Sequence, residues 1–412
     1  MSSIPLTRRD ALSGWIAFLP TLGRYAHQRN HVEPLHRNVS RLSAALRYRL
    51  LLEDEVVSDT LRTHEFGVVE KWLQEICWRR YWKGWLEMRP DVWTSWRQRV
   101  QELSGTLPEA VVQRALAVAA GEGGVACMDA IVRELITTGY LHNHARMWWA
   151  SYWIHVEGLP WELGADLFFR RLLDADPASN TLSWRWVAGL QTPGKTYIVR
   201  RSNIEKYAPE LLCERTGSER IADGAFSPAV AIEFADTTRQ ALPDHPTTVP
   251  HSDRRMGLWL HTDDLLPETG PLAHLTLVTI AAFSSDHGHH SALSEQRIAA
   301  LDEVLADGLA RAAAHFRCPT VQSKDADPVA GFCTWATTHS LDEVVAFAPT
   351  VGPEADLVPR LRRLLSFAGI TLTLIRRASD AHAFTLAGAG FFPFWEKMSR
   401  HLREQSSLPG ER

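Results

Sequence analysis

Two carboxylates, an amide and two indole rings lie close together in the stretch Asp174-Ala175-Asp176-Pro177-Ala178-Ser179-Asn180-Thr181-Leu182-Ser183-Trp184-Arg185-Trp186. Asp176 followed by Pro177 is typical of a helix start, because an N-cap carboxylate accepts hydrogen bonds from free backbone N–H groups and proline suits the first turn. The simplest interpretation is a capped turn before a helix. The density of polar and aromatic side chains also fits a ligand site.

A second polar group precedes this stretch in Leu141-His142-Asn143-His144-Ala145-Arg146-Met147. If these residues begin a helix, Asn143, Arg146 and Met147 share one face, because their offsets are 3 and 4. A polar helix face requires a polar neighbour. The two segments therefore mark one region of interest.

The chain from Ala11 to about Glu214 has mostly helical apolar spacing. The longest predicted helix runs from Glu65 to Met88. One of its faces carries Val69, Trp72, Leu73 and Ile76, and another carries Glu75, Trp78, Arg79 and Trp82. We therefore predict an all-α domain over residues 1–215.

A proline-bearing segment over residues 216–255 predicts a linker, because it has little periodicity. From Met256 onward, short apolar runs alternate with helical spacing, which predicts a parallel sheet with covering helices. The predicted strands cover residues 257–261, 275–283, 344–347 and 370–375, and the predicted helices cover 294–316, 355–367 and 388–402. The fold class is thus α plus α/β, with a Rossmann-like domain over 256–412 that lacks a G-x-G-x-x-G fingerprint.

The composition is that of an ordinary globular protein, since 45% of the 412 residues are hydrophobic and 22% are charged. The longest apolar run, Leu275–Phe283, is about half of the ~20 residues that a membrane-spanning helix needs. Five cysteines without a C-x-x-C pair argue against a disulfide scaffold, a zinc ribbon or an iron–sulfur cluster.

Charge and tryptophan are distributed unevenly along the chain. Residues 1–215 hold 27 Lys and Arg against 24 Asp and Glu, whereas residues 216–412 hold 17 against 24. A polyanion should therefore prefer the first half. That half also holds 13 of the 16 tryptophans, which fit either a bulky core or an aromatic ligand site.

Three motifs have simpler explanations than a function. Gly189 to Thr196 matches the phosphate-loop pattern G-x-x-x-x-G-K-[ST], but it lies in the helical half, so a turn with a solvated Lys195 is the better interpretation. Asp286-His287-Gly288-His289-His290 is compact and predicts a solvated loop, so no metal site is expected. Arg8-Arg9 superficially resembles an export signal, but the following segment contains Trp15 and Pro20, and we expect a cytoplasmic protein without a membrane partner.

Four sequence blocks together resemble the DNA photolyase and cryptochrome family, over about Arg24 to Ala208. In family order they are Asn38-Val39-Ser40-Arg41-Leu42-Ser43, Glu75-Ile76-Cys77-Trp78-Arg79, His142 to Met147, and Asp174 to Trp186. Four blocks in order are far more specific than any one of them.

The resemblance implies FAD as cofactor, with any second antenna chromophore unknown. Residues matched to the FAD phosphates and ribityl chain would be Val39, Ser40, Arg41, Leu42 and Ser43. Tyr25 and Trp72 would pack on the cofactor, and Arg79, Asn143 and Arg146 would lie along it. Asp174 and Asp176 resemble the acids that meet the flavin ring and its sugar, and Asn180 resembles the amide beside flavin N5.

The resemblance also implies a pocket for a flipped-out cyclobutane pyrimidine dimer. The matching residues are Glu75, Trp78, Asn143, Met147 and Trp186, of which Glu75 and Asn143 would act on the lesion. Family members that act on (6-4) photoproducts carry histidines where this chain has Asn143 and Met147.

Electron transfer to the flavin would use Trp184 and then Trp161, as the family's tryptophan chain does. No tryptophan occurs at the third position of that chain, near Leu107 to Glu109, so Trp148, Trp149 or Trp153 could replace it. Val156 stands where an acidic partner of Arg146 is usual, with Glu157 adjacent.

The order of the domains also departs from the family. The family's α/β domain normally precedes the FAD domain, whereas here residues 256–412 resemble it, with Met256 to Leu260 similar to its opening strand and Phe391-Phe392-Pro393-Phe394-Trp395 similar to its closing segment. We interpret the order as a circular permutation; the alternative is an unrelated α/β domain.

The sequence thus leaves three hypotheses. The first is a light-driven lyase that repairs UV-damaged DNA with reduced FAD, as a monomer. The second is a cryptochrome-like blue-light receptor with a signalling partner. The third is a flavoprotein that acts on a different lesion or substrate.

Overall fold

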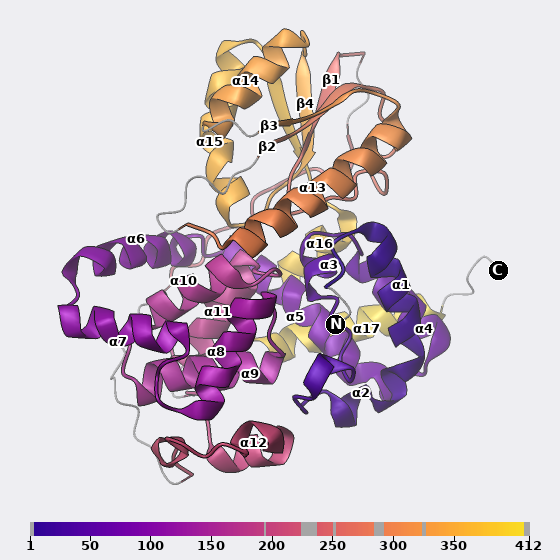
Figure 1. The fold of residues 1–412 in the computed structure, drawn as a ribbon. Coiled ribbons are helices and arrows are strands. Elements are labelled where there is room, and N and C mark those ends of the chain that lie inside the picture. Colours follow the sequence, from indigo (N-terminus) through magenta and orange to yellow (C-terminus); the bar gives the residue numbers. More distant parts are fainter. Residues whose placement is uncertain are drawn as a thin grey trace.

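The computed structural model describes residues 4–192, 195–223, 237–249, 253–283, 292–323 and 327–407. Helices form the first part of the chain, as predicted, and the long helix over 65–88 is observed as α5 (Figure 1). The helices are α1 (Arg8–Phe18), α2 (Leu22–Gln28), α3 (Ser43–Arg47), α4 (Glu53–Thr63), α5 (Phe66–Glu87), α6 (Asp91–Thr106), α7 (Glu109–Ala120), α8 (Ala126–Thr138), α9 (Asn143–Ser151), α10 (Trp161–Arg171), α11 (Pro177–Val187) and α12 (Arg201–Tyr207).

A parallel sheet follows, and within the described residues it has five strands in the order β3-β2-β1-β4-β5. Helices connect the later strands, as parallel pairing requires. The elements are β1 (Met256–Leu260), β2 (Leu277–Phe283), α13 (Glu295–Phe316), β3 (Thr320–Ser323), α14 (Pro328–Thr338), β4 (Glu343–Phe347), α15 (Pro353–Phe367) and β5 (Thr371–Ile375). The fold class predicted from the sequence, α plus α/β, is confirmed.

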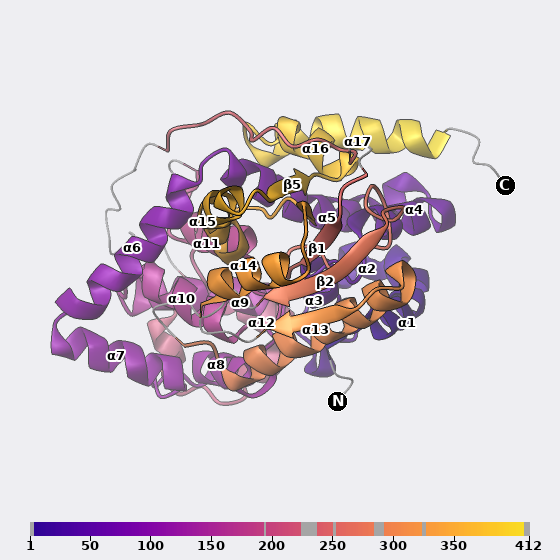
Figure 2. The same ribbon diagram turned by 90° about the horizontal axis from the view of Figure 1, so that it is seen from above.

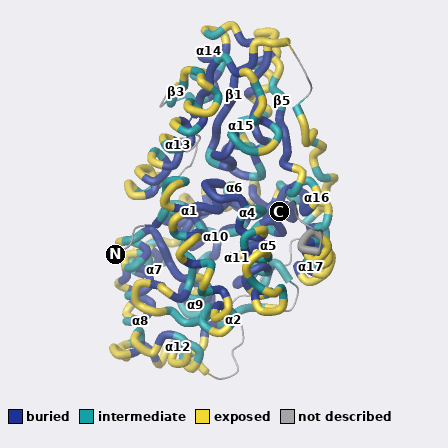
Figure 3. Tube along the Cα trace, turned by 90° about the vertical axis from the view of Figure 1, so that its right-hand side faces the viewer, coloured by how far each residue is buried: buried dark blue, intermediate teal, exposed yellow. Residues whose placement is uncertain are grey.

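Both faces of the sheet are buried, which explains why its central strands are apolar throughout. On β1, Leu258 and Leu260 belong to a core that includes residues of α13 and continues into the helical half. Trp259 points to the opposite face, into a smaller core with residues of α14 and α15. Figure 3 shows the resulting buried interior along the strands and through the centre of the helical half.

The chain returns to the helical half after the sheet. Helices α16 (Ala378–Leu386) and α17 (Phe391–Ser407) pack against α5, and the view from above shows them beside it (Figure 2). Gly84 of α5 permits this approach, because a Cβ there would lie 2.8 Å from the Cα of Phe384 in α16. α5 thus contacts both the N-terminal helices and the last two helices of the chain.

Three elements after residue 255 were not among the sequence predictions: β3, α14 and α16. β3 is a short edge strand with the polar sequence Thr-Val-Gln-Ser, so it lacks the apolar run that marks a buried strand. The domain boundaries at 215 and 255 stay predictions.

Part of the predicted linker is held in place by backbone hydrogen bonds. Gln240 N donates to Met88 O at the end of α5, and Arg376 N donates to Pro246 O. Residues 237–249 therefore lie along the junction of the two halves. Among the described residues, none of the helices has the length and apolar character needed to cross a membrane.

Candidate functional site

The predicted N-cap at the start of α11 is present. Asp176 accepts a hydrogen bond from Ser179 N at 2.8 Å, with Pro177 in the first turn. The other carboxylate oxygen, Oδ2, is buried and faces three cations, Arg79, Arg47 and Lys83, at 3.6, 3.7 and 3.8 Å. Cap formation therefore uses only half of this carboxylate.

The charge on Asp176 is set by these neighbours. Burial opposes ionisation, but the positive charges of Lys83, Arg47 and Arg79 outweigh it and hold the pKa of the carboxyl well below its usual range. Burial also lowers the pKa of Lys83, against the attraction of Asp176. Arg47 also pairs with Asp263 at 2.8 Å, so the cluster holds two buried carboxylates and three cations, an excess of positive charge that favours an additional anion.

Asp174 lies beside the polar face of α9. Arg146 Nη2 donates to Asp174 Oδ2 at 2.8 Å, and although burial opposes ionisation of Asp174, Arg146 keeps the pKa of the carboxyl lowered. The sequence offered Glu157 as a neighbour for Arg146, but Glu157 instead pairs with Arg114 and Arg220. The acidic partner of Arg146 is therefore Asp174, which lies 28 residues further along the chain and was not predicted from the sequence.

The loop over residues 38–43 approaches this pair through Tyr140. The guanidinium carbons of Arg41 and Arg146 lie 5.6 and 5.7 Å from the centre of the Tyr140 ring, and burial raises the pKa of Tyr140 to about 12. Arg41 has a φ of 56°, a left-handed conformation that is unusual outside glycine and concentrates at functional sites. Leu42 N donates to Ser40 Oγ at 3.3 Å.

The predicted cofactor residues of this loop are not equivalent. The side chain of Leu42 is fully buried in the core, so only its backbone is available to a ligand. Val39 packs on the same core, and Ser40 and Ser43 flank Arg41 with hydroxyl groups. A loop of this kind offers hydroxyls and one guanidinium to an anion.

Buried polar atoms without a hydrogen-bond partner gather among these residues. Within the described part of the chain, they include Arg41 Nε, Trp72 Nε1, Arg79 Nη1 and Asp176 Oδ2. Buried polar groups are almost always satisfied, and each exception calls for a ligand or another cause. Arg79 Nη1 and Asp176 Oδ2 lie 3.6 Å apart as an ion pair without a hydrogen bond. Buried atoms of this kind on residues that were predicted from the sequence to form one cofactor site are the strongest feature of this region.

Aromatic side chains form the wall on the N-terminal side. Trp72 meets Tyr25 edge-on at 5.1 Å and stacks on Trp15 at 5.8 Å. Burial, with Glu75 adding to it, raises the pKa of Tyr25 well above its usual range. Both predicted packing residues thus lie together, with Trp15 behind Trp72.

Asn180 and Trp184 project from α11 one turn apart. Asn180 Nδ2 donates to Ala165 O at 2.9 Å, which leaves the amide oxygen as the group available to a ligand N–H. The ring of Trp184 lies 6.2 Å from that of Trp149, and Trp149 lies 5.2 Å from Trp153. Trp161 makes no ring contact with another aromatic residue in the described ranges.

Glu75 on α5 has an ion-pair partner that was not among the residues predicted from the sequence. Arg29, which follows α2, donates through Nη1 to Glu75 Oε1. Burial raises the pKa of Glu75, and Arg29 opposes that rise. The spacing of Tyr25 and Arg29, four residues apart along the chain, was the only sequence signal that could have pointed to Arg29.

Trp78 lies one turn further along α5. Its ring stacks on Phe391 of α17 with centroids 3.6 Å apart and planes 7° from parallel. Trp82 and Tyr81 contact its other sides. One face of Trp78 is therefore covered by the C-terminal helix.

The remaining predicted pocket residues lie on α9 and α11. Asn143 is exposed, and its Nδ2 approaches Met147 Sδ at 3.9 Å, so the predicted shared face exists. Trp186 is half-buried and stacks on Tyr197 at 5.4 Å. No interaction joins either group directly to Glu75 within the described residues.

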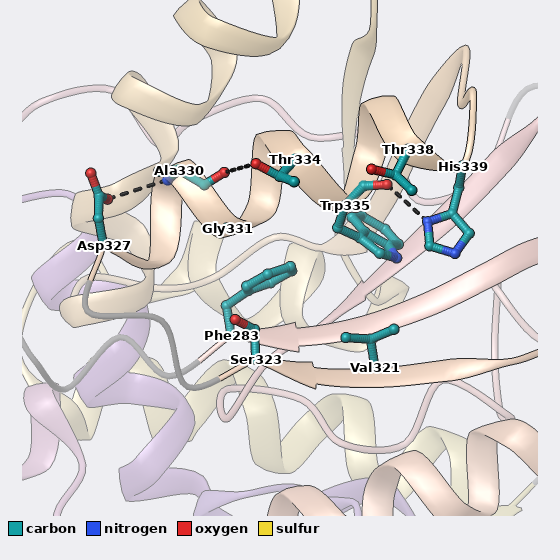
Figure 4. Close-up of a pocket in the computed structure, with 10 residues that line it drawn as sticks. All are labelled: Phe283, Val321, Ser323, Asp327, Ala330, Gly331, Thr334, Trp335, Thr338 and His339. Atoms are coloured by element: carbon teal, nitrogen blue, oxygen red, sulfur yellow. Dashed lines mark hydrogen bonds between the residues drawn. The ribbon is translucent and has the colours of Figure 1, made fainter.

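A separate hollow of about 540 Å³ lies between α14 and the ends of β2 and β3 (Figure 4). Its one carboxylate, Asp327, caps α14 and pairs with Arg360, and His339 bonds to Trp335 O. It therefore presents no grouping of catalytic side chains. Its lining residues are Phe283, Val321, Ser323, Asp327, Ala330, Gly331, Thr334, Trp335, Thr338 and His339.

Two of the sequence motifs gain no support as sites. The phosphate-loop string follows helix α11, and Lys195 N donates to Thr192 O in a turn, so the strand–loop–helix context is missing; Pro193 and Gly194 lie outside the described residues. The stretch Asp286 to His290 also lies outside them.

Comparison with known proteins covers the region just described. Residues 72–211 match the family model described as the FAD binding domain of DNA photolyase. The chain is 30% identical over 190 residues to the deoxyribodipyrimidine photo-lyase of Escherichia coli, covering 42% of this chain and 37% of that protein. It is 33% identical over 194 residues to the deoxyribodipyrimidine photo-lyase of Thermus thermophilus, covering 45% and 44%.

A shorter match reaches a cryptochrome. The chain is 42% identical over 88 residues to cryptochrome DASH of Natronomonas pharaonis, covering 21% of this chain and 19% of that protein. The match to each photo-lyase spans less than half of that protein's own length.

Proposed function

Through residues 72–211 this chain belongs to the DNA photolyase and cryptochrome family, and we propose that it is a light-driven flavoprotein that repairs cyclobutane pyrimidine dimers in DNA. The observation that carries the proposal is the set of buried polar atoms without a hydrogen-bond partner on Arg41, Trp72, Arg79 and Asp176, of which the last two are joined only by an ion pair at 3.6 Å. These atoms fit a large polar cofactor, because a cofactor supplies the hydrogen-bond partners that the described residues do not.

The match to the FAD binding domain of DNA photolyase supports FAD as the cofactor of this site. Arg41, Ser40 and Ser43 would hold its phosphates with a guanidinium and two hydroxyls. The cations around Asp176 favour that anion, and Asn180 would present its amide oxygen to the flavin. When bound and reduced, FAD supplies a blue-light chromophore that donates one electron.

The lesion would lie between Glu75, Trp78, Asn143, Met147 and Trp186. An extruded dimer would stack on the rings of Trp78 and Trp186, and such stacking does not depend on the base sequence. Glu75 can hydrogen-bond a base edge and stabilise charge that develops on the dimer, a role that helps most in the charged state. Arg29 would hold the Glu75 carboxylate in place.

Electrons would reach the flavin through indole rings. We place Trp184 first, and its ring contact with Trp149, followed by Trp153, offers a route in addition to Trp161. Electronic coupling falls steeply with distance, so electron transfer is fastest between rings that are in contact. The ring of Phe168 contacts both, at 5.1 Å from Trp184 and 5.4 Å from Trp149.

One observation favours a cryptochrome-like receptor as the second candidate. Phe391 covers a face of Trp78 at 3.6 Å, which leaves less of that ring for a base. In a receptor, the same contact would join the flavin region to the C-terminal helix α17.

Repair of a defined lesion tests the proposal. The holoprotein, chemically reduced, is mixed with a dimer-containing single-stranded oligonucleotide, and repaired sites are counted in blue light and in the dark. Repair that requires light is expected. The variant Glu75→Gln should lower the yield, whereas Glu65→Gln, a carboxylate at the start of the same helix, should not. Absence of repair by fully reduced, FAD-loaded protein would favour the receptor.

A further inference from the structure

Two arginines meet beside the start of α17. Arg89, just beyond α5, donates through Nη2 to Gly388 O at 3.2 Å and lies over the Trp85 ring at 4.2 Å. The guanidinium of Arg239 lies against the same glycine, since a Cβ on Gly388 would meet its nitrogen and carbon atoms at 2.7–2.9 Å. Residues 237–249, which carry Arg239, are fixed there by the bond from Gln240 N to Met88 O.

Neither guanidinium forms an ion pair with a carboxylate in the described ranges. Two acidic groups on the same helices are otherwise engaged: Glu87 is buried against Arg376, and Glu396 pairs with Arg400. Burial and then the charge of Arg239 lower the pKa of Arg89. Two uncompensated like charges held together are stabilised by an anion that bridges them.

An exposed aromatic ring continues this surface toward Trp78. Phe392, in the first turn of α17, is 76% exposed, and its ring lies 6.0 Å from that of Phe391. Phe391 is the residue that stacks on Trp78. The surface therefore runs from the predicted pocket, across an exposed aromatic ring, to two cations without a carboxylate partner among the described residues.

We infer that Phe392, Arg89 and Arg239, here called the flank surface, bind the DNA strand that continues from a base held at Trp78. Aromatic rings beside guanidinium groups are the combination that binds single strands without sequence preference, because bases stack on rings and phosphates pair with cations. The inference rests on the proposed function. It adds a contact made by residues from both the linker and the last helix, which lie outside the region that matches the FAD binding domain.

The length of α5 sets the reach of this contact. Glu75 and Glu87, near the two ends of the strip, are twelve residues apart on one helix, which is about 18 Å at 1.5 Å per residue. At 3.4 Å per nucleotide along one strand of B-form DNA, that distance corresponds to about five nucleotides. The arginines therefore act on the flank of the lesion and not on the lesion itself.

Binding in the dark to oligonucleotides with short and long flanks tests this inference. Fluorescence anisotropy is measured for the holoprotein with a central dimer flanked on each side by about two or about eight nucleotides, across a range of salt concentrations. The variants are Arg239→Gln and Phe392→Ala, both at exposed side chains. The control Arg360→Gln removes the same charge from α15, where Arg360 is paired with Asp327.

The long-flank substrate should reveal the difference. Arg239→Gln should weaken its binding and reduce the salt slope by about 0.7, the value for one phosphate on a single strand. Phe392→Ala should weaken it by about 5- to 150-fold, the equivalent of one lost base stack. Short-flank binding of Arg239→Gln should stay within about twofold of wild type. Phe392→Ala should weaken binding at both flank lengths, because Phe392 lies next to Phe391, which stacks on Trp78.

The outcomes separate the two proposals. If wild type binds and repairs the dimer but Arg239→Gln and Phe392→Ala match Arg360→Gln on the long substrate, the flank surface is wrong and the proposed function stands. If wild type shows no preference for the dimer at all, both the flank surface and the proposed function are wrong. Equal losses of Arg239→Gln on both flank lengths would also overturn the inference, because the contact of Arg239 would then belong to the pocket.

Discussion

The buried ion cluster between the two halves allows a quantitative prediction for Asp264→Ala. Asp264 follows β1, and its carboxylate accepts two hydrogen bonds from Arg377, at 2.7 and 2.9 Å, and one from Arg49 at 2.9 Å. All three side chains are buried. Arg49 belongs to the helical half, so its bond to Asp264 joins the sheet to that half. Arg49 also has a left-handed φ of 54°.

The loss can be bounded from the contacts that remain. Without Asp264, Arg49 keeps Asp380 at 2.5 Å, and Arg377 keeps the carbonyl oxygens of Leu266 and Thr269 at 2.8 and 3.1 Å. Neither guanidinium is left without a hydrogen-bond partner, but both buried positive charges lose the neutralising charge of Asp264. Removing one partner of a buried ion cluster typically costs about 3–5 kcal/mol, and we expect Asp264→Ala to fall in that range.

Urea unfolding followed by tryptophan fluorescence measures the change, with the control Glu396→Ala. Glu396 forms an ion pair with Arg400 in which both side chains are largely exposed, so its loss should change the free energy of unfolding by less than about 1 kcal/mol. If Asp264→Ala were destabilised no more than this control, the cluster would not stabilise the junction as argued.

Three further predictions concern the cofactor site and the response to acid. Asp176→Ala should leave the helical fold detectable by circular dichroism but reduce bound FAD, measured by absorbance after gel filtration, because the cofactor loses the carboxylate predicted to meet the flavin and its sugar and the buried cations lose the charge that fixes their positions; full FAD occupancy would contradict this. Trp149→Phe should slow photoreduction of oxidised FAD, followed by its absorbance under blue light, more than Trp161→Phe does, since the Trp149 ring contacts that of Trp184; the reverse order would favour Trp161. The pKa values of Asp176 and Asp264 are lowered in the folded protein, so the stability that their ionised forms contribute is present above the ordinary pKa of 3.8 and is lost as the pH falls below it. The free energy of unfolding should therefore decrease when the pH is lowered below about 4. A free energy of unfolding that does not change with pH in this range would contradict the assignment.

Local patterns were sufficient for many of the elements. Asp176 before Pro177 indicated a helix start that the structure confirms, and the helical spacing over 65–88 predicted α5. Both depend on interactions within a few residues of the chain, namely caps and side-chain periodicity. The edge strand β3 escaped prediction because its pairing with β2, and not its own composition, makes it a strand.

The candidate site was only partly accessible from the sequence, for the same reason. The blocks around Ser40, Glu75, Asn143 and Asp174 could be recognised by resemblance, but their electrostatic partners could not. Arg47 and Lys83 surround Asp176 only after α3, α5 and α11 pack together.

The amino-acid sequence by itself determined the helical and sheet-bearing halves and the identity of the side chains offered to a cofactor. Tertiary structure decided which charges meet: Arg146 with Asp174, Arg29 with Glu75, and Arg239 beside Arg89. The physical reason is range, because caps and helical faces arise from neighbours along the chain, whereas an ion pair between distant residues exists only where packing brings both groups out of water together.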